Sequence, residues 1–179
     1  WFHFANNYVD SLDRAAEALA ARLGGLSPET GAIEGYLRDA LSVSLIYSGQ
    51  AGLRSFDAEM GHLTIDPSQP VESRRFQLAH QLAALALKDE ISAVVESAAL
   101  RSAASRQLLF VGLCNYAAGA LLMPYARFRA EARAVRHDID RLAQTFGTSF
   151  EQACHRHSLQ HRQNQGMYGR KYGSYLSAC

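Results

Sequence analysis

The sequence predicts an α+β fold that is mostly helical and contains one small antiparallel sheet. Two observations predict the helices. Apolar residues recur at three- and four-residue spacing near the start of the chain, and two later segments, 73–87 and 107–123, are apolar almost throughout. A third observation predicts the sheet, because apolar and polar residues alternate in short runs between residues 42 and 66.

The first predicted helix is amphipathic and runs from Asn6 to Leu23. Its apolar positions share one face, and two consecutive glycines end it. Ser27, followed by Pro28 and an acidic residue, is typical of the start of a second helix with serine as its N-cap. We expect this second helix to continue to about Leu41.

Three short strands are expected next, at 42–47, 53–57 and 62–66. A turn at 48–52 separates the first two strands, and the glycine of Met60-Gly61 allows a reversal into the third. Consecutive strands joined by tight turns usually pair with opposite directions. We therefore expect a small antiparallel sheet.

Two buried helices are the most apolar elements of the chain. The segment 73–87 leaves so little polar surface that its helix should be deeply buried. A helix-rich linker at 90–105 leads to the second buried helix, 107–123, which Pro124 ends because proline cannot continue a helix.

The remaining residues are more polar. Segment 125–146 is charged and amphipathic, and Thr148 or Ser149 is expected to cap a short helix that follows it. We expect the domain to comprise residues 1–156, and residues 157–179 to form a polar tail without regular structure.

Composition is that of an ordinary globular domain. The chain has 179 residues, 48% of them hydrophobic, and a net charge of +1, so its overall charge gives no reason to expect nucleic acid or a membrane as a partner. Three widely spaced cysteines do not form a disulfide framework, and no apolar run reaches the roughly 18 residues that span a bilayer. We expect a cytoplasmic protein, and the start at Trp1 indicates a piece of a longer chain.

The most informative motif lies on the buried helix 73–87. Zinc peptidases carry H-E-x-x-H on such a helix, where two histidines on one face bind the metal and the glutamate is the general base. Here the frame reads H-Q-x-x-A: His80 keeps the first ligand position, Gln81 replaces the base and Ala84 replaces the second ligand. The pattern indicates a metallopeptidase scaffold without its chemistry.

A second motif strengthens this interpretation. Residues 113–124 read L-C-N-Y-A-A-G-A-L-L-M-P, and this segment resembles the E-x-N-x-F-A-x-x-L-L-M-P pattern of the ImmA/IrrE-like family of minimal zinc peptidases. The resemblance implies a zincin-like pair of helices, and it places Leu113 where the family has a glutamate ligand. One imidazole cannot replace the three protein ligands of a catalytic zinc site, so the pair is degenerate and no metal ligand is assigned.

We therefore predict that the chain is not an enzyme but a pseudo-metallopeptidase. Gln81 cannot accept a proton near neutral pH, so the base is lost together with the metal ligands. Two alternatives stay open: an active zinc metallopeptidase with unusual ligands, and a purely structural dimerisation module.

The chain has a closer resemblance to the short-chain fatty acyl transcriptional regulators, the PrpR/RamB-like group, carried by the segments 6–17, 75–82 and 115–125. The resemblance implies a sensor whose effector is a short-chain acyl-CoA, propionyl-CoA or acetyl-CoA, and which controls propionate or acetate metabolism through the methylcitrate or glyoxylate routes. It also implies a homodimer that binds DNA through an N-terminal helix-turn-helix absent from this chain. An iron–sulfur cluster is expected only in a C-terminal region beyond it.

Candidate ligand-binding residues follow from this resemblance and from residue chemistry. Cations beside a helix N-terminus suit phosphate, and tyrosines stack on bases or bond carbonyl oxygens. The candidates for acyl-CoA are Tyr36, Arg38, Arg74, Arg75, His80, Gln81, Tyr116 and Tyr125. Each also has an ordinary alternative: a solvated charge for the arginines, a core or rim position for the tyrosines, a satisfied buried histidine, and a glutamine bonded to a neighbouring backbone carbonyl.

Overall fold

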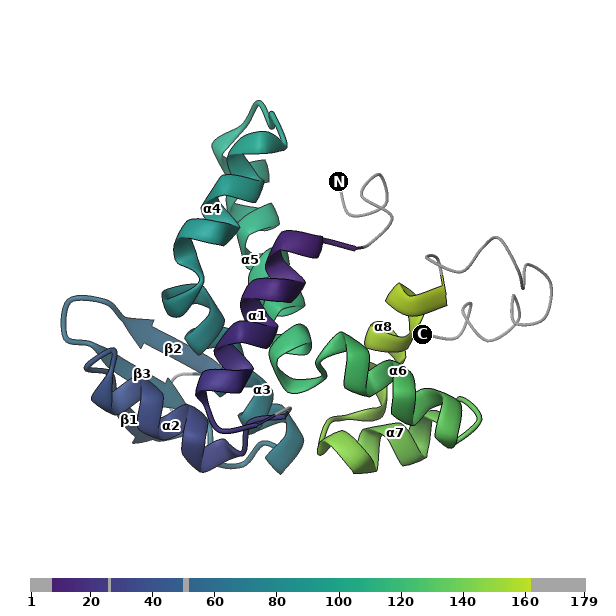
Figure 1. Cartoon of the computed structure of the whole chain (residues 1–179). Helices are drawn as coiled ribbons and strands as arrows, with labels where there is room; N and C mark the ends of the chain where they lie inside the picture. The colour runs from purple at the N-terminus through teal and green to yellow at the C-terminus, as the bar shows by residue number, and fades with distance from the viewer. Residues whose placement is uncertain (1–7, 26, 50–51, 162–179) are drawn as a thin grey trace.

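The computed structural model describes residues 8–25, 27–49 and 52–161, and this part of the chain confirms the predicted class (Figure 1). It is mainly helical and contains one three-stranded sheet. The elements are α1 (Asp10–Arg22), α2 (Thr30–Asp39), β1 (Ser44–Tyr47), β2 (Arg54–Asp57), β3 (His62–Ile65), α3 (Val71–Ala86), α4 (Lys88–Ser97), α5 (Ala103–Leu122), α6 (Tyr125–Ala134), α7 (Ile139–Phe146) and α8 (Phe150–His161).

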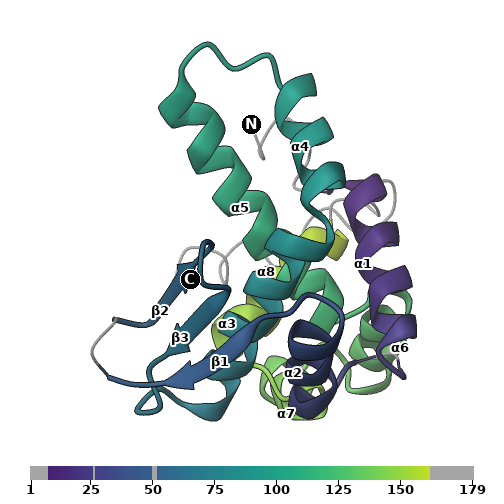
Figure 2. The same cartoon turned by 90° about the vertical axis from the view of Figure 1, so that its left-hand side faces the viewer.

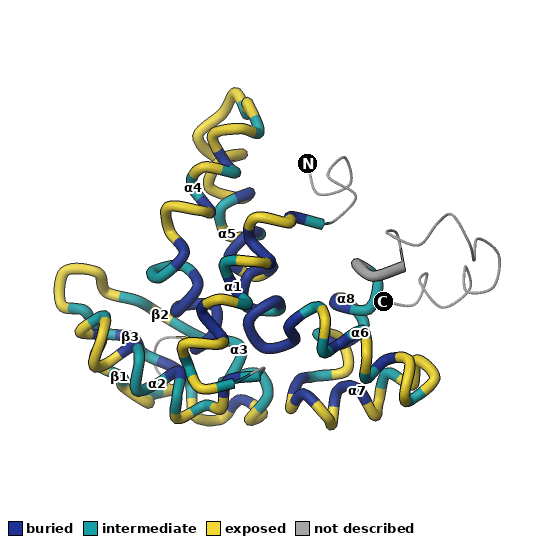
Figure 3. The backbone as a smooth tube through the Cα atoms, in the orientation of Figure 1, coloured by how far each residue is buried: buried dark blue, intermediate teal, exposed yellow. Residues whose placement is uncertain are grey.

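The core lies where α1, α3 and α5 meet. The helices α3 and α5 pack against each other, and α1 packs on α5, so α5 has neighbours on two sides. This arrangement explains why the second half of α5 is apolar around its circumference rather than along one stripe. In Figure 3 the buried residues gather at this junction, whereas the projecting end of the α4–α5 hairpin is exposed.

The sheet is mixed, so the prediction of a wholly antiparallel sheet is wrong in one of its two pairings. The strand order is β1-β3-β2: β2 pairs with β3 antiparallel, and β1 pairs with β3 parallel. The chain does reverse after β1, as expected, but β3 lies between β1 and β2 (Figure 2). Since two successive reversals restore the original direction, β1 and β3 run the same way.

The β2–β3 turn matches the expected reversal at Met60-Gly61. Gly61 has a φ of +65°, a left-handed conformation that favours glycine. The Asp57 carboxylate accepts hydrogen bonds from the backbone N–H groups of Glu59 and Met60, both at 3.0 Å. A Cβ at position 61 would also lie 3.1 Å from the Ser42 carbonyl oxygen, so this turn leaves little room for a side chain.

Two predicted helix starts are corrected. The first helix begins at Asp10, and residues 6 and 7 lie outside the described part of the chain. The second begins at Thr30 with Glu29 at its N-cap, so Ser27 is not the cap. Instead, the Ser27 hydroxyl donates a hydrogen bond of 2.8 Å to the carbonyl of Leu122, and this contact fastens the α1–α2 connection to the end of α5.

The C-terminal part is more helical than predicted. Segment 125–146 forms two helices, α6 and α7, and α8 continues through residue 161, beyond the predicted domain end at 156. Of the two expected caps, Ser149 is the one that forms, in a reciprocal capping box with Gln152 at the start of α8. The Ser149 hydroxyl accepts from the N–H of Gln152 at 3.2 Å, and the Gln152 side-chain carbonyl accepts from the N–H of Ser149 at 3.0 Å. Residues 162–179 of the predicted tail lie outside the described residues.

No single helix in the described ranges is long and apolar enough to cross a bilayer. The helices α5 and α6 meet a length and composition criterion only as a pair, which is bent by 60°.

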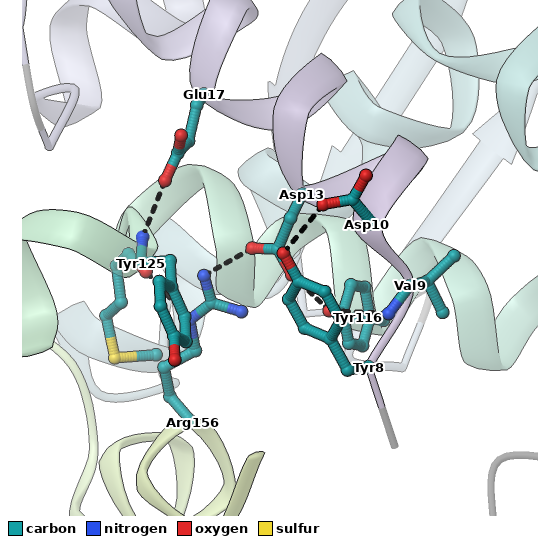
Figure 4. A network of polar contacts seen from close by, with 9 residues as sticks. Tyr8, Val9, Asp10, Asp13, Glu17, Tyr116, Tyr125 and Arg156 are labelled. Atoms are coloured by element: carbon teal, nitrogen blue, oxygen red, sulfur yellow. Dashed lines mark hydrogen bonds and ion pairs between the residues drawn. The ribbon is translucent and has the colours of Figure 1, made fainter. Parts of the chain in front are cut away.

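A buried ion pair joins the first and last described helices (Figure 4). Arg156 of α8 donates to the Asp13 carboxylate of α1 at 2.5 Å, and the two side chains are only 2% and 3% exposed. Arg156 also donates through Nε to the carbonyl of Met123 at 2.8 Å. Tyr116 of α5 donates its hydroxyl to the other oxygen of Asp13 and accepts the N–H of Val9 at 3.1 Å. Three helices are thereby tied to one carboxylate.

This network predicts that Asp13→Ala is strongly destabilising, because it leaves a buried guanidinium without its counter-charge. We expect a loss of about 3–5 kcal/mol in the free energy of unfolding. At roughly 2–4 °C per kcal/mol, the melting temperature should fall by about 6 °C or more. Urea and thermal unfolding measure both quantities.

The matched control is Arg14→Ala, which breaks an ion pair with Asp10 whose side chains are 77% and 51% exposed. Exposed pairs contribute about 1 kcal/mol or less. Equal losses in the two variants would contradict a central role for the Asp13 carboxylate.

Candidate functional site

The degenerate motif is assembled between α3 and α5. His80 and Gln81 of α3 are 6% and 4% exposed, and Leu113 of α5 is fully buried. Ala84 lies one turn beyond His80 on α3 and is half-buried. We call these four positions the frame. It contains one imidazole, one amide and two apolar side chains.

A side chain that the sequence analysis did not single out contacts the frame. Arg54 of β2 donates a hydrogen bond of 2.5 Å from Nη1 to the Gln81 carbonyl oxygen. Arg54 is half-buried, and this desolvation lowers the pKa of its guanidinium. A permanent positive charge therefore lies beside the position where a metallopeptidase holds its metal.

The period of the strand could have identified Arg54. In β2 the residues alternate between half-buried and exposed, so Arg54 and Phe56 share the inward face while Ser55 and Asp57 face solvent. An arginine on the same face as a phenylalanine is an exception to apolar-in, polar-out patterning. Such an exception marks a buried cation that needs a partner.

The charge of Arg54 acts on two neighbouring groups. Burial, reinforced by Arg54, lowers the pKa of His80 to about 4, so this imidazole is neutral at pH 7. Burial raises the pKa of Cys114 to about 11, against the opposing effect of Arg54, so this thiol stays protonated. The Nδ1 atom of His80 is buried and has no hydrogen-bond partner among the described residues.

These groups suit the binding of an electron-rich ligand atom better than that of a cation. In the described part of the chain, no group of three histidine, cysteine or acidic side chains is arranged to hold a metal ion. A catalytic zinc needs three such ligands, and Arg54 would repel it. The frame offers a neutral imidazole and an amide, and the neighbouring Arg54 and Cys114 add guanidinium donors and a protonated thiol.

Arg75 is part of the same helix, but its side chain is bonded to backbone carbonyls and a hydroxyl of other segments. Its Nη1 donates to the carbonyls of Phe146 and Gly147 at 2.5 and 3.0 Å, and its Nη2 donates to the Ser27 hydroxyl and the Pro28 carbonyl at 3.1 and 2.7 Å. Gly147 has a φ of +57°, and a Cβ there would lie 3.0 Å from Nη1 of Arg75. This guanidinium clamps α3 to the end of α7 and to the start of α2.

The other predicted arginines are on the surface. Arg74 donates one hydrogen bond of 2.9 Å to the Pro67 carbonyl, in an exposed position. Arg38 forms an exposed ion pair of 2.8 Å with its neighbour Asp39. Tyr36 lies 6.0 Å from the Arg22 guanidinium, at a shallow open hollow between the end of α1 and α2. Arg38 and Tyr36 thus belong to α2 rather than to the frame.

Tyr116 and Tyr125 belong to the Asp13 network in Figure 4. Burial and the adjacent Asp13 carboxylate raise the pKa of Tyr116, so its hydroxyl remains a donor. The N–H of Tyr125 donates to the Glu17 carboxylate at 2.8 Å, and the Arg156 guanidinium lies 5.8 Å from its ring centroid. Of the predicted candidates, His80 and Gln81 lie together in the frame. A role in ligand binding stays a prediction for all eight residues.

One known family model matches the part of the chain that contains the frame. Residues 47–158 match the model of the IrrE N-terminal-like domain, a peptidase family of the M78 class. This match contains β2, β3, the five helices from α3 to α7 and most of α8.

Curated proteins similar to this chain are regulators. The chain is 38% identical over 164 residues to a propionyl-CoA carboxylase regulator of Cereibacter sphaeroides, a match that covers 90% of this chain and 34% of that protein. It is 34% identical over 172 residues to the HTH-type transcriptional regulator PrpR of Mycobacterium tuberculosis, covering 92% of this chain and 35% of that protein. The chain therefore spans about a third of the length of these relatives.

A solved structure has the same fold. The chain matches a Mycobacterium tuberculosis transcriptional regulator with a TM-score of 0.81 and 33% identity, over 87% of this chain and 49% of that one.

The buried imidazole predicts a specific dependence of stability on pH. The pKa of His80 is about 4 in the folded state against an ordinary value of 6.5, so the unfolded chain binds this proton more readily. The stabilising contribution is complete above pH 6.5 and is lost as the pH falls towards 4. Between about pH 7.5 and about pH 5 we expect the loss to be roughly 2 kcal/mol.

Urea unfolding of wild type and His80→Gln at these two pH values measures this contribution. The variant should lose about 2 kcal/mol less than wild type on acidification. His155→Gln, at an exposed position of α8, is the control and should behave as wild type. An identical acid loss in wild type and His80→Gln would show that His80 does not carry it.

The two adjacent arginines of α3 predict a contrast under one substitution. Arg75→Lys loses a planar group with four hydrogen bonds, and we expect about 2–3 kcal/mol of destabilisation. Arg74→Lys loses one exposed hydrogen bond and should change stability by about 0.5 kcal/mol or less. Thermal unfolding compares the two; a larger effect at Arg74 would contradict the clamp.

Proposed function

Because the chain belongs to the IrrE N-terminal-like domain family, we propose that it is the non-catalytic effector-sensing domain of a bacterial transcription regulator of short-chain fatty acid metabolism. One observation carries the proposal: the guanidinium of Arg54 is hydrogen-bonded to Gln81 of the frame. An enzyme of this family needs a metal and a carboxylate base, and this chain has a cation and an amide instead.

The relatives support the regulatory part of the proposal. One is named a propionyl-CoA carboxylase regulator and another an HTH-type transcriptional regulator. A helix-turn-helix outside this chain would bind DNA in the cytoplasm, and the present domain would bind the effector. We propose propionyl-CoA or acetyl-CoA as that effector, without zinc.

The arrangement of charges suggests how the effector lies. The acyl end is directed at the frame, where the neutral imidazole of His80 adjoins the protonated thiol of Cys114 and the guanidinium of Arg54. Of the two arginines on α3, Arg74 is the better candidate for the CoA phosphates, because the Arg75 donors are already bonded to carbonyls and a hydroxyl.

Dimerisation is a compatible second role of the same domain. On α5, Leu108 is 75% exposed and Val111 is 40% exposed, and both lie on the projecting half of the α4–α5 hairpin. Exposed apolar side chains that adjoin on one helix can form part of a contact between subunits. The symmetric homodimer that regulators commonly form would bury them.

The proposal predicts that propionyl-CoA raises the melting temperature of the chain. A ligand at about 100 times its dissociation constant adds roughly 2.7 kcal/mol to the free energy of unfolding. At about 2–4 °C per kcal/mol, the expected shift is roughly 5–10 °C. Thermal unfolding with and without the ligand measures it.

Zinc chloride and CoA are the controls in the same experiment. Zinc should give no stoichiometric binding, and His80→Ala should leave the metal content unchanged. Stoichiometric zinc that disappears in His80→Ala would instead support a metallopeptidase with unusual ligands. An absent shift with every CoA thioester would overturn the acyl-CoA sensor.

A further inference from the structure

Arg54 carries a charge that the described protein does not compensate. Four ion pairs occur among the described residues, and their cations are Arg14, Arg38, Arg141 and Arg156. Three of these arginines are largely exposed, and the fourth, Arg156, is buried against Asp13. Arg54 is half-buried, and its hydrogen bond among the described residues is to the neutral Gln81 amide. Partly removing a cation from water without a counter-charge is unfavourable.

The guanidinium is oriented but not saturated. The bond to Gln81 holds Nη1, and the other two nitrogens are not among the buried polar atoms that lack a partner, so they keep access to solvent. A guanidinium held on one side presents its remaining N–H donors in a fixed fork, which matches the two oxygens of a carboxylate.

A second observation independently points to a missing partner. His80 is only 6% exposed, and its Nδ1 atom has no hydrogen-bond partner in the described ranges. Buried polar atoms of this kind are usually bonded to protein, water or a ligand. His80 is also close enough to Arg54 for the guanidinium charge to help lower the pKa of its imidazole.

We propose that Arg54 is the recognition group for a carboxylate of the effector, with His80 Nδ1 as a further polar contact beside it. The proposal rests on the effector-sensing function and changes its ligand class: in place of propionyl-CoA or acetyl-CoA, the effector is a short-chain carboxylate, either a free acid or a carboxylated acyl thioester. A plain acyl thioester has a neutral carbonyl oxygen and would leave the charge of Arg54 uncompensated. A carboxylate supplies both the counter-charge and the two-oxygen geometry.

The test is isothermal titration of the chain with four probes: succinyl-CoA, propionyl-CoA, sodium propionate and CoA. We expect succinyl-CoA to bind at least about tenfold more tightly than propionyl-CoA, as charged hydrogen bonds require. Sodium propionate distinguishes a free acid from a carboxylated thioester.

The variant Arg54→Gln should abolish the preference for the carboxylate, with a loss of about 10- to 100-fold in affinity for succinyl-CoA and little change for propionyl-CoA. Arg54→Lys keeps the charge and loses the fork, so it should be intermediate and guards against misfolding of the glutamine variant. Arg141→Gln, at an arginine whose side chain is 70% exposed, is the control and should bind as wild type.

The outcomes separate this inference from the proposed function. Equal binding of succinyl-CoA and propionyl-CoA, unaffected by Arg54→Gln, would overturn the role of Arg54 and leave the acyl-CoA sensor standing. Binding of sodium propionate that Arg54→Gln removes, without binding of any thioester, would uphold the carboxylate site and overturn the acyl-CoA effector. Binding of none of the four probes to a folded chain would overturn both.

Discussion

The carboxylate of Asp13 is the interaction on which the arrangement of the helices depends. It lies in α1, accepts a hydrogen bond from Tyr116 of α5 and pairs with Arg156 of α8, all away from solvent. A buried ion pair adds little net stability compared with apolar side chains of the same volume. It nevertheless tolerates few alternative geometries, because displacing one partner leaves the other charge buried and unpaired. The helix α5, which carries Leu113 of the frame, is thus held in one position by contacts outside the frame.

The buried Arg156 and the half-buried Arg54 differ in how their positive charges are compensated. Arg156 is compensated by a carboxylate and by the Met123 carbonyl, and its surroundings are complete apart from Nη1. Among the described residues, Arg54 forms a hydrogen bond only with an amide oxygen. Stability alone would favour an apolar residue at position 54, since β2 would then have a uniformly apolar inner face. The proposed carboxylate contact would give the charge at position 54 a role in binding, whereas the contacts of Arg156 are structural.

Much of the fold could be predicted from sequence because its signals are local. The strands, the two buried helices, the turn at Gly61 and the cap at Ser149 each depend on residues within a few positions of one another. The failures involve partners far apart in the chain. The parallel pairing of β1 with β3 depends on where a third strand inserts, and Ser27 serves Leu122 and Arg75 rather than the helix that follows it. The motif identified His80 and Gln81, whereas Arg54 follows from an inward-facing position in a four-residue strand.

The helix α5 passes from the frame to the Asp13 network within one turn. Leu113 and Cys114 lie at the frame, and Tyr116, two to three residues later, accepts the N–H of Val9 and donates to Asp13. At 1.5 Å of rise per residue, these contacts are separated by less than about 5 Å along the axis. A helix of this kind moves as a stiff rod over such a length. The contacts that hold α1 therefore lie within about one helical turn of the frame, so a ligand that displaced α5 at the frame would act directly on the bonds of Tyr116 to Val9 and Asp13.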